Sequence, residues 1–203
     1  MKKLPLSFYT RENVFEIAKE VLGKLLVTKW DDIITSGRIV ECEAYAGISD
    51  KASHASGGRR TTRNEIMYGN GGNAYIYLCY GIHHLFNVVT NKSDIPHAVL
   101  IRAVEPVSGI KEMMKRMNLK TPDPFITRGP GKLSRALGIY TQHSGISLNG
   151  SSIFIADDGY VVNKNEIAAS PRIGVAYAGK DAILPYRFYI KGNPFVSGNR
   201  IKS

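Results

Sequence analysis

Apolar residues recur at helical spacing in three segments of the chain. The first segment has an apolar face formed by Val14, Ile17, Ala18, Val21 and Leu22. The hydroxyl of Thr10 can accept a hydrogen bond from a free amide in the first turn of a helix, and Gly23 can take the positive φ that ends many helices. These positions predict an amphipathic helix that begins after an N-cap at Thr10 and ends before Gly23.

Two shorter helices are predicted in the second half of the chain. Residues Ile110–Met117 have the apolar spacing of a helix, and Pro122 and Pro124 are expected to end it because proline cannot continue a helix. The other helix begins in the segment Gly129–Lys132, where a proline suits the first turn. Gly138 is expected to end that helix.

Alternating apolar and polar residues predict several half-buried strands. A strand at Arg38–Tyr45 is expected to follow a turn at Gly37. Because side chains alternate across a strand, one face of it would present Ile39, Glu41, Glu43 and Tyr45. Further strands are predicted at Ala74–Cys79, Leu85–Val89, Ala98–Val104 and Arg187–Ile190. The Gly-, Ser-, Thr- and Arg-rich stretch from 47 to 73 is expected to be a long functional loop.

The order of these elements predicts a mixed α/β domain, of the α+β kind, built on an antiparallel sheet. No repeat, low-complexity tract or inter-domain linker interrupts the sequence, so residues 1–203 are expected to form a single domain. The chain is 43% hydrophobic and 22% charged, which is the composition of a protein with one substantial core.

The charge balance indicates a polyanionic partner. Lys and Arg outnumber Asp and Glu by 27 to 17, which gives a net charge of +10. The basic residues are spread through loops and do not form one amphipathic helix, which favours nucleic acid over a membrane surface. Lys2 and Lys3 are not followed by the apolar region of a signal peptide, and Cys42 and Cys79 lack metal or disulfide spacing. A cytoplasmic location is expected.

The predicted strand Arg38–Tyr45 has the groups needed to cut a glycosidic bond. Glu41 and Glu43 lie two residues apart and share a face with Tyr45. One carboxylate could activate water or stabilise a sugar cation while the aromatic ring holds the leaving base. Exposed strand faces also often carry glutamate without any chemical role, so the pair alone leaves both interpretations open.

Three tyrosines lie on or beside the predicted hairpin. Tyr75 and Tyr77 share one face of a strand, and aromatic residues in that position are more often core residues than ligands, so Tyr75 is expected in the core. Tyr80 precedes Gly81 at the predicted tip. A phenol at a hairpin tip is poorly placed for a core and well placed to insert between DNA bases.

Basic segments offer contacts for phosphate groups. The loop between residues 57 and 64 has three arginines beside backbone amides and hydroxyls, namely Arg59, Arg60 and Arg63. A solvated charged loop is the alternative. Lys132 follows a Gly-Pro-Gly run at a helix start but lacks the spacing of a nucleotide-binding P-loop. His83 and His84 would point to opposite faces of a strand without a second ligand at metal spacing, so no metal is expected.

Five segments of the chain form an ordered pattern. They are Arg38–Tyr45, His54–Asn64, Ala74–Asn87, Ile101–Pro106 and Arg172–Val175. In this order they resemble the alkyladenine DNA glycosylases, also called 3-methyladenine or methylpurine DNA glycosylases. The resemblance extends from about Leu6 to Ser197. It implies a single domain with a curved antiparallel sheet, flanked by helices, from which a β-hairpin enters the minor groove of DNA.

The resemblance also implies the roles of two catalytic residues. Glu43 matches the residue that activates the attacking water, and Arg102 with the main chain near Ile173 matches the rest of the water's cradle. The activity implied is that of a monofunctional DNA-3-methyladenine glycosylase, which flips a damaged purine out of the duplex and hydrolyses its N-glycosidic bond without a cofactor.

The base pocket implied by the resemblance is aromatic. Tyr45 and Tyr77 would stack on the flipped base, and His54 would close the pocket and contact the base edge. Asn87 would guard the pocket mouth and tune the substrate range. Tyr80 would fill the gap that the flipped base leaves in the duplex. Because a purine alkylated at N3 or N7 is positively charged, electron-rich rings can select it by cation–π attraction.

The expected partner is double-stranded DNA containing damaged purines, and the protein is expected to act as a monomer without a protein partner. The expected substrates are 3-methyladenine and 7-methylguanine, with hypoxanthine and ethenoadenine as further candidates. For the neutral bases, the proton donor would be His54 or ordered water. Two alternatives remain open, namely a basic nucleic-acid-binding module without catalysis and a formyltransferase-like small-molecule enzyme.

Overall fold

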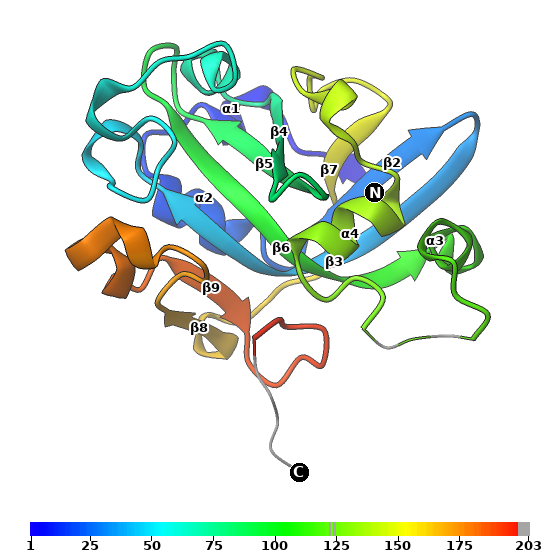
Figure 1. The fold of residues 1–203 in the computed structure, drawn as a ribbon. Coiled ribbons are helices and arrows are strands. Elements are labelled where there is room, and N and C mark those ends of the chain that lie inside the picture. Colours follow the sequence, from blue (N-terminus) through cyan, green and yellow to red (C-terminus); the bar gives the residue numbers. More distant parts are fainter. Residues whose placement is uncertain (122, 124, 199–203) are drawn as a thin grey trace.

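A strongly twisted antiparallel sheet organises the molecule (Figure 1). The computed structural model describes residues 1–121, 123 and 125–198. Neighbouring strands follow the order β1-β7-β2-β3-β6-β5-β4, while β9 pairs with β3 and β8 pairs with β9. The strands are β1 Lys2–Lys3, β2 Leu25–Trp30, β3 Ile33–Tyr45, β4 Ala74–Cys79, β5 His83–Thr90, β6 His97–Ser108, β7 Ile153–Asp157, β8 Ile167–Ser170 and β9 Arg187–Ile190. This architecture confirms the predicted mixed α/β class and its antiparallel sheet.

The described residues contain four short α-helices. They are α1 Leu6–Tyr9, α2 Val14–Glu20, α3 Ile110–Met117 and α4 Pro130–Leu137. α2 packs against β3 and β6, whereas α4 packs against β5 and β6. Their apolar faces join the main hydrophobic cluster, in which Ile17, Leu133 and Leu137 are fully buried. α3 and α4 are the longest α-helices of the described residues, and their eight residues fall far short of the about 20 needed to cross a membrane.

Two predicted helix ends differ from the structure. The N-cap of α2 is Asn13 and not Thr10, because the Asn13 side chain accepts hydrogen bonds from the amides of Phe15 and Glu16 at 3.0 and 3.2 Å. Thr10 instead ends the separate helix α1. α3 ends at Met117 because Asn118 adopts the left-handed conformation, with a φ of 56°. Pro122 and Pro124, predicted to end this helix, lie outside the described residues.

β3 is longer than predicted and contains Gly37. The turn before it is formed by Asp31 and Asp32, whose φ values of 47° and 65° give the tight two-residue connection of a hairpin. A Cβ at Gly37 would lie 2.5 Å from the Val104 side chain, so this position needs glycine for close strand contact and not for a turn. The first half of β3 pairs with β2 and the second half with β9, while β6 runs along its other edge.

A β-bulge interrupts the pairing of β3 with β6 beside Glu41. Glu41 pairs with Ala103 and Cys42 pairs with Ile101, so Arg102 is an extra residue in β6. A second register shift separates Ile39 from Glu41, and Ile39 belongs to the main hydrophobic cluster. The strict alternation predicted for β3 therefore does not extend to Ile39.

Candidate active site

Glu43 is a fully buried carboxylate with three donors around it. Its Oε1 accepts the Ile173 amide at 2.8 Å and lies 3.1 Å from Nη1 of Arg102, while its Oε2 accepts the Tyr45 hydroxyl at 2.8 Å. Hydrogen bonds and positive charge favour the ionised form of a carboxylate. The structure thus brings together Glu43, Arg102 and the Ile173 main chain, the three groups that the resemblance placed around the attacking water, and adds the Tyr45 hydroxyl to them.

The hydroxyl of Tyr45 acts as a donor in this arrangement. Burial, and then the negative charge of Glu43, raises the pKa of Tyr45 well above its usual value, so the hydroxyl keeps its proton. The guanidinium of Arg172 lies 4.8 Å from the Tyr45 ring centroid. The hydroxyl and the ring of Tyr45 are therefore both held in place.

Arg102 lies between two carboxylates. Its Nε donates to Glu41 at 2.8 Å, and its Nη1 faces Glu43. Burial by itself lowers the pKa of Arg102, but the charges of Glu43 and Glu41 outweigh burial and raise it. Arg102 therefore stays cationic, and its positive charge stabilises the Glu43 carboxylate.

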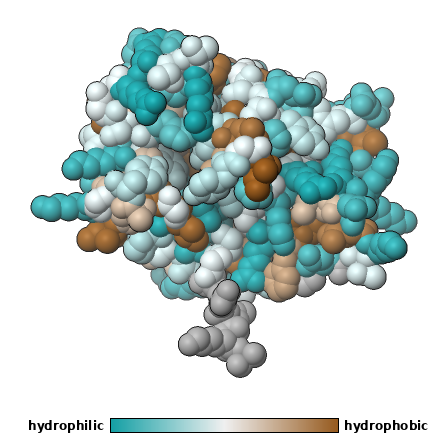
Figure 2. Space-filling model, viewed as in Figure 1, coloured by the Kyte–Doolittle hydropathy of each residue, from teal (hydrophilic) through white to brown (hydrophobic). Residues whose placement is uncertain are grey.

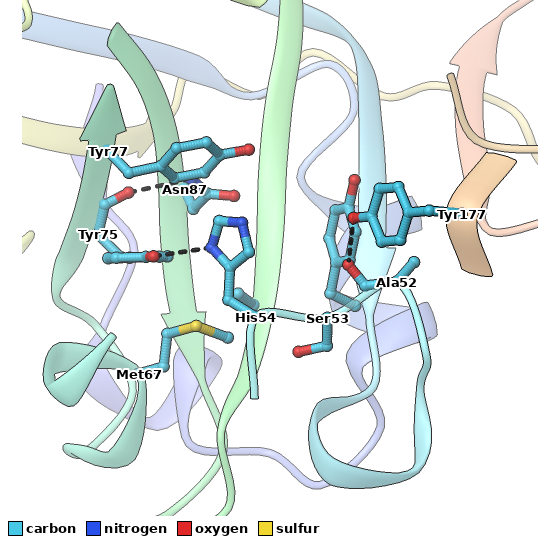
Figure 3. Close-up of a pocket in the computed structure, with 10 residues that line it drawn as sticks. Ala52, Ser53, His54, Met67, Tyr75, Tyr77, Asn87 and Tyr177 are labelled. Atoms are coloured by element: carbon cyan, nitrogen blue, oxygen red, sulfur yellow. Dashed lines mark hydrogen bonds between the residues drawn. The ribbon is translucent and has the colours of Figure 1, made fainter. Parts of the chain in front are cut away.

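The aromatic residues predicted for base binding surround a small cavity of about 30 Å³ (Figure 3). His54 lies between Tyr75 and Tyr77 on one side and Tyr177 on the other, and its ring centroid is 4.6 Å from that of Tyr77. Tyr75 is buried, as predicted, and its hydroxyl lies 2.8 Å from Nδ1 of His54. This hydrogen bond fixes the imidazole ring against the pocket wall.

Asn87, which the resemblance placed at the pocket mouth, lines this cavity. It is 3% exposed, and its Nδ2 donates to the carbonyls of Tyr75 and Leu85 at 3.1 and 3.2 Å. The pairing of β4 with β5 places it opposite Tyr75, inside the sheet. Its carboxamide can therefore contact the inner edge of a base.

His54 is neutral at physiological pH. Burial, and then the positive charges of Arg63 and Arg59, lowers its pKa to about 4. A histidine that is already deprotonated at pH 7 is a poor proton donor. This weighs against His54 as a general acid, although it remains well placed to contact a base.

A larger cleft of about 610 Å³ adjoins the cavity. The cavity and the cleft share four aromatic residues, namely Tyr45, His54, Tyr77 and Tyr177. Arg63, Arg102, Arg128 and Lys132 also line the cleft, and none of its described lining residues is acidic. A cleft whose charged lining residues are all basic favours a polyanion such as DNA.

The hairpin of β4 and β5 ends in a projecting turn. Tyr80 and Gly81 have φ values of 52° and 74°, and the Ile82 amide donates to the Cys79 carbonyl at 3.2 Å. Tyr80 is 88% exposed and lines the cleft. Figure 2 shows apolar side chains over the end of this hairpin in a largely hydrophilic face, and Ile82 is 70% exposed. The turn thus has the exposed aromatic tip that the sequence predicted.

The predicted phosphate contacts are in different situations. Arg59 and Lys132 are exposed, and Arg63 lies 5.1 Å from the Tyr77 ring centroid beside the cleft. Arg60 forms ion pairs with two carboxylates on the loop surface, at 2.6 and 2.9 Å from Glu65 and Asp94. Arg60 would have to give up these partners to bind a phosphate, so a smaller contribution is expected from it.

Lys132 lies at the start of α4, where the hairpin approaches closely. A Cβ on Gly131 would lie 2.8 Å from Nδ1 of His83, so only glycine allows β5 and α4 to approach this closely. The first amides of a helix have no partner within it and attract anions. This geometry brings the hairpin, the helix start and Lys132 to one rim of the cleft.

A comparison with known proteins tests the resemblance found in the sequence. Residues 7–194 match the family model described as methylpurine-DNA glycosylase. The chain belongs to this family. Three relatives, each named "Putative 3-methyladenine DNA glycosylase", come from Bacillus cereus (strain G9842), Bacillus cytotoxicus and Bacillus thuringiensis (strain Al Hakam). They are 48%, 46% and 46% identical to it, across 95 to 96% of this chain and 98 to 99% of theirs.

Membership of the methylpurine-DNA glycosylases confirms the predicted resemblance and identifies a DNA-repair glycosylase. The expected partner is accordingly DNA. Among the residues that the structure describes, no three His, Cys, Asp or Glu side chains come together as a metal ion would require.

The site of this methylpurine-DNA glycosylase includes three residues without a predicted role, namely Asp50, Arg172 and Tyr177. Arg172, whose side chain is fully buried, donates to Asp50 at 2.5 and 2.8 Å and to the Ala44 carbonyl at 3.0 Å. It thereby fixes the chain just before Ile173. The hydroxyl of Tyr177 donates to the Ala52 carbonyl at 3.1 Å. One signal pointed to Arg172, because it begins a segment of the ordered pattern that resembles the family.

Proposed function

We propose that this protein excises positively charged alkylpurines, such as 3-methyladenine and 7-methylguanine, from duplex DNA by hydrolysis. The observation that supports this most directly is the group formed by Glu43, Arg102 and the Ile173 amide at the edge of a cationic, aromatic cleft. A carboxylate held ionised can take a proton from water as the water attacks the sugar carbon. The purine then leaves and an abasic site remains.

Base selection in this proposal begins with flipping. The cavity of about 30 Å³ has room for about one water molecule, so a purine must be accommodated from the adjoining cleft. The four aromatic residues shared by cavity and cleft mark the place where it would enter. Stacking on Tyr45 and Tyr77 offers roughly 1–3 kcal/mol each, and cation–π attraction adds on the order of 0.5–2 kcal/mol for a charged base. These terms offset an unstacking cost of about a few kcal/mol.

The low pKa of His54 favours bases that leave without taking up a proton. A purine alkylated at N3 or N7 leaves without being protonated, whereas hypoxanthine and ethenoadenine would need a proton donor. His54 is a poor candidate because its pKa is about 4. Hypoxanthine and ethenoadenine are therefore proposed as slower substrates, with ordered water as their proton source.

One assay tests the proposed function directly. Duplexes containing a single 7-methylguanine or a single hypoxanthine are incubated with excess protein, and base release and alkali-labile sites are measured. The proposal expects release of 7-methylguanine, no adduct trapped by borohydride, and slower release of hypoxanthine. A gel shift without release would indicate a non-catalytic DNA-binding module, while a trapped adduct would indicate an amine nucleophile.

A further inference from the structure

A second carboxylate, Glu41, is buried beside the site and has no role in the chemistry proposed above. It is fully buried and accepts four hydrogen bonds. The donors are Nε of Arg102 at 2.8 Å, Nε of Arg187 at 2.7 Å, and the amide and hydroxyl of Ser197 at 2.6 and 2.8 Å. Two of these donors are charged guanidinium groups.

Glu41 and its partners control the orientation of Arg102. The guanidinium is planar and presents its donors in a fixed fork. Its Nε is held by Glu41, its Nη2 donates to the Ser197 hydroxyl at 3.2 Å, and its Nη1 faces Glu43 at 3.1 Å. With Nε and Nη2 held, the plane cannot rotate, and Nη1 stays directed at Glu43.

The same residues balance the charge around the site. Glu41 and Glu43 are negative, while Arg102 and Arg187 are positive, and all four are buried. Arg187 is tied to Glu41 and, through Nη2, to the Ser197 carbonyl at 2.5 Å. Without the charge of Glu41, two guanidinium groups would share a single carboxylate, which is Glu43.

We propose that Glu41 is a positioning residue, which directs Nη1 of Arg102 toward Glu43 and neutralises the second guanidinium of this buried group. The inference rests on the proposed function, because it assigns Glu41 a role in the same hydrolysis. A buried ion pair is by itself weak evidence for a stabilising role, since desolvation offsets much of its attraction. The ion pair between Glu41 and Arg102 has a functional role in this proposal, because it directs Nη1 of Arg102 toward Glu43.

The test is single-turnover 7-methylguanine excision by Glu41→Gln and by the conservative variant Glu41→Asp. For Glu41→Gln the rate is expected to fall about tenfold or more, with DNA affinity within about threefold of wild type. Glu41→Asp keeps the negative charge between Arg102 and Arg187 and should recover part of the lost rate. The double variant Glu41→Gln/Arg187→Gln restores the charge count and should also recover part of it.

One further variant keeps the inference open to refutation. Ser197→Ala removes the hydroxyl between Glu41 and Arg102 without changing charge, so it should slow excision several-fold and leave DNA affinity unchanged. This variant also serves if Glu41→Gln fails to fold. A wild-type rate in Ser197→Ala, or in a folded Glu41→Gln protein, would overturn the role of Glu41. Absence of excision by the wild-type protein would instead overturn the proposed function itself.

Discussion

The proposed hydrolysis depends on the buried carboxylate of Glu43, which must carry a negative charge and accept a proton from water. Glu43→Gln keeps the shape of the side chain and removes both properties. Base release is expected to fall on the order of 100-fold or more, while affinity for damaged DNA stays within a few-fold. Single-turnover excision and a binding titration measure the two effects. Glu12→Gln, with a side chain that is 83% exposed, is the matched control. Near wild-type release by Glu43→Gln would remove Glu43 from its proposed role.

The hydroxyl and the ring of Tyr45 can be separated by a single substitution. Tyr45→Phe removes the donor to Oε2 of Glu43 and keeps the aromatic face. Excision is expected to slow about tenfold without loss of DNA affinity, because a hydrogen bond to a charged group is worth about 1.5–3 kcal/mol. Tyr75→Phe, which removes the bond to His54 instead, should leave the Glu43 group intact. Equal kinetics for the two variants would mean that the Tyr45 hydroxyl has no particular role.

His54 also links pH to the stability of the fold. Its pKa falls from 6.5 to about 4 on folding, so the unfolded chain binds the proton more readily. The resulting stability is fully present above about pH 6.5 and is lost as the pH falls toward 4, with an upper bound of about 3 kcal/mol. Thermal unfolding measured from pH 7 to pH 4.5 should show a smaller decline in Tm for His54→Gln than for wild type. The decline will not vanish, because burial also lowers the pKa of His97 and His143.

At the scale of elements, local patterns predicted most of the secondary structure. β4, β9 and the end of α4 at Gly138 lie where alternation, apolar spacing and a terminal glycine predicted them. Thr10 and Gly37 were misassigned because their residue types fit two local roles, and only the packing of α1 and the close contact with Val104 decide between these roles. The bulge at Arg102 depends on pairing with a distant strand. It has no local pattern.

The β4–β5 hairpin gives a prediction specific to an element, because its tip is exposed on a rigid pair of strands. If Tyr80 fills the gap left by the flipped nucleotide, it opposes re-stacking and does not affect the bond being broken. Tyr80→Ser should therefore slow excision most for a lesion in a well-paired duplex and least for a lesion opposite a mismatch. Tyr45→Ser should impair both, because it damages the pocket.

The measurement for the hairpin is single-turnover excision on matched and mismatched duplexes of otherwise identical sequence. Ile82→Ser changes another strongly exposed apolar residue of the same turn and is the control. If Tyr80→Ser loses the same factor on both duplexes, the ring acts within the pocket and not as a wedge.

At the scale of the whole molecule, the site joins segments that are distant in sequence. Glu43 receives donors from Ile173, which is 130 residues away, and Arg172 is 122 residues from Asp50. Composition and spacing could identify Glu43 and Tyr45 as candidates, but they could not show that Asp50 and Arg172 support the Ile173 amide. Resemblance to the family supplied Arg102 and Ile173. Glu41 drew attention only as a neighbour of Glu43, and its link to Ser197 is visible only in three dimensions.

The net charge of +10 makes a prediction about the molecule as a whole. Each phosphate neutralised by a cation releases a counterion, so the logarithm of the DNA association constant should fall with the logarithm of salt concentration, with a slope of about −0.9 per phosphate. Arg59, Arg63 and Lys132 are exposed or line the cleft, and each is a predicted phosphate contact. Neutral substitution of each should flatten the slope by about 0.9 units.

Arg60 provides the internal comparison for this measurement, because its charge is already balanced by Glu65 and Asp94. Arg60→Gln should therefore change the slope less than Arg59→Gln, although the two residues are adjacent arginines of the same loop. The titrations use an undamaged duplex, so that only non-specific binding is measured and the base pocket makes no contribution. A smaller slope change for Arg59→Gln than for Arg60→Gln would mean that the loop reorganises to release Arg60 to DNA. Unchanged slopes for Arg59, Arg63 and Lys132 variants would assign these residues to the solvated surface.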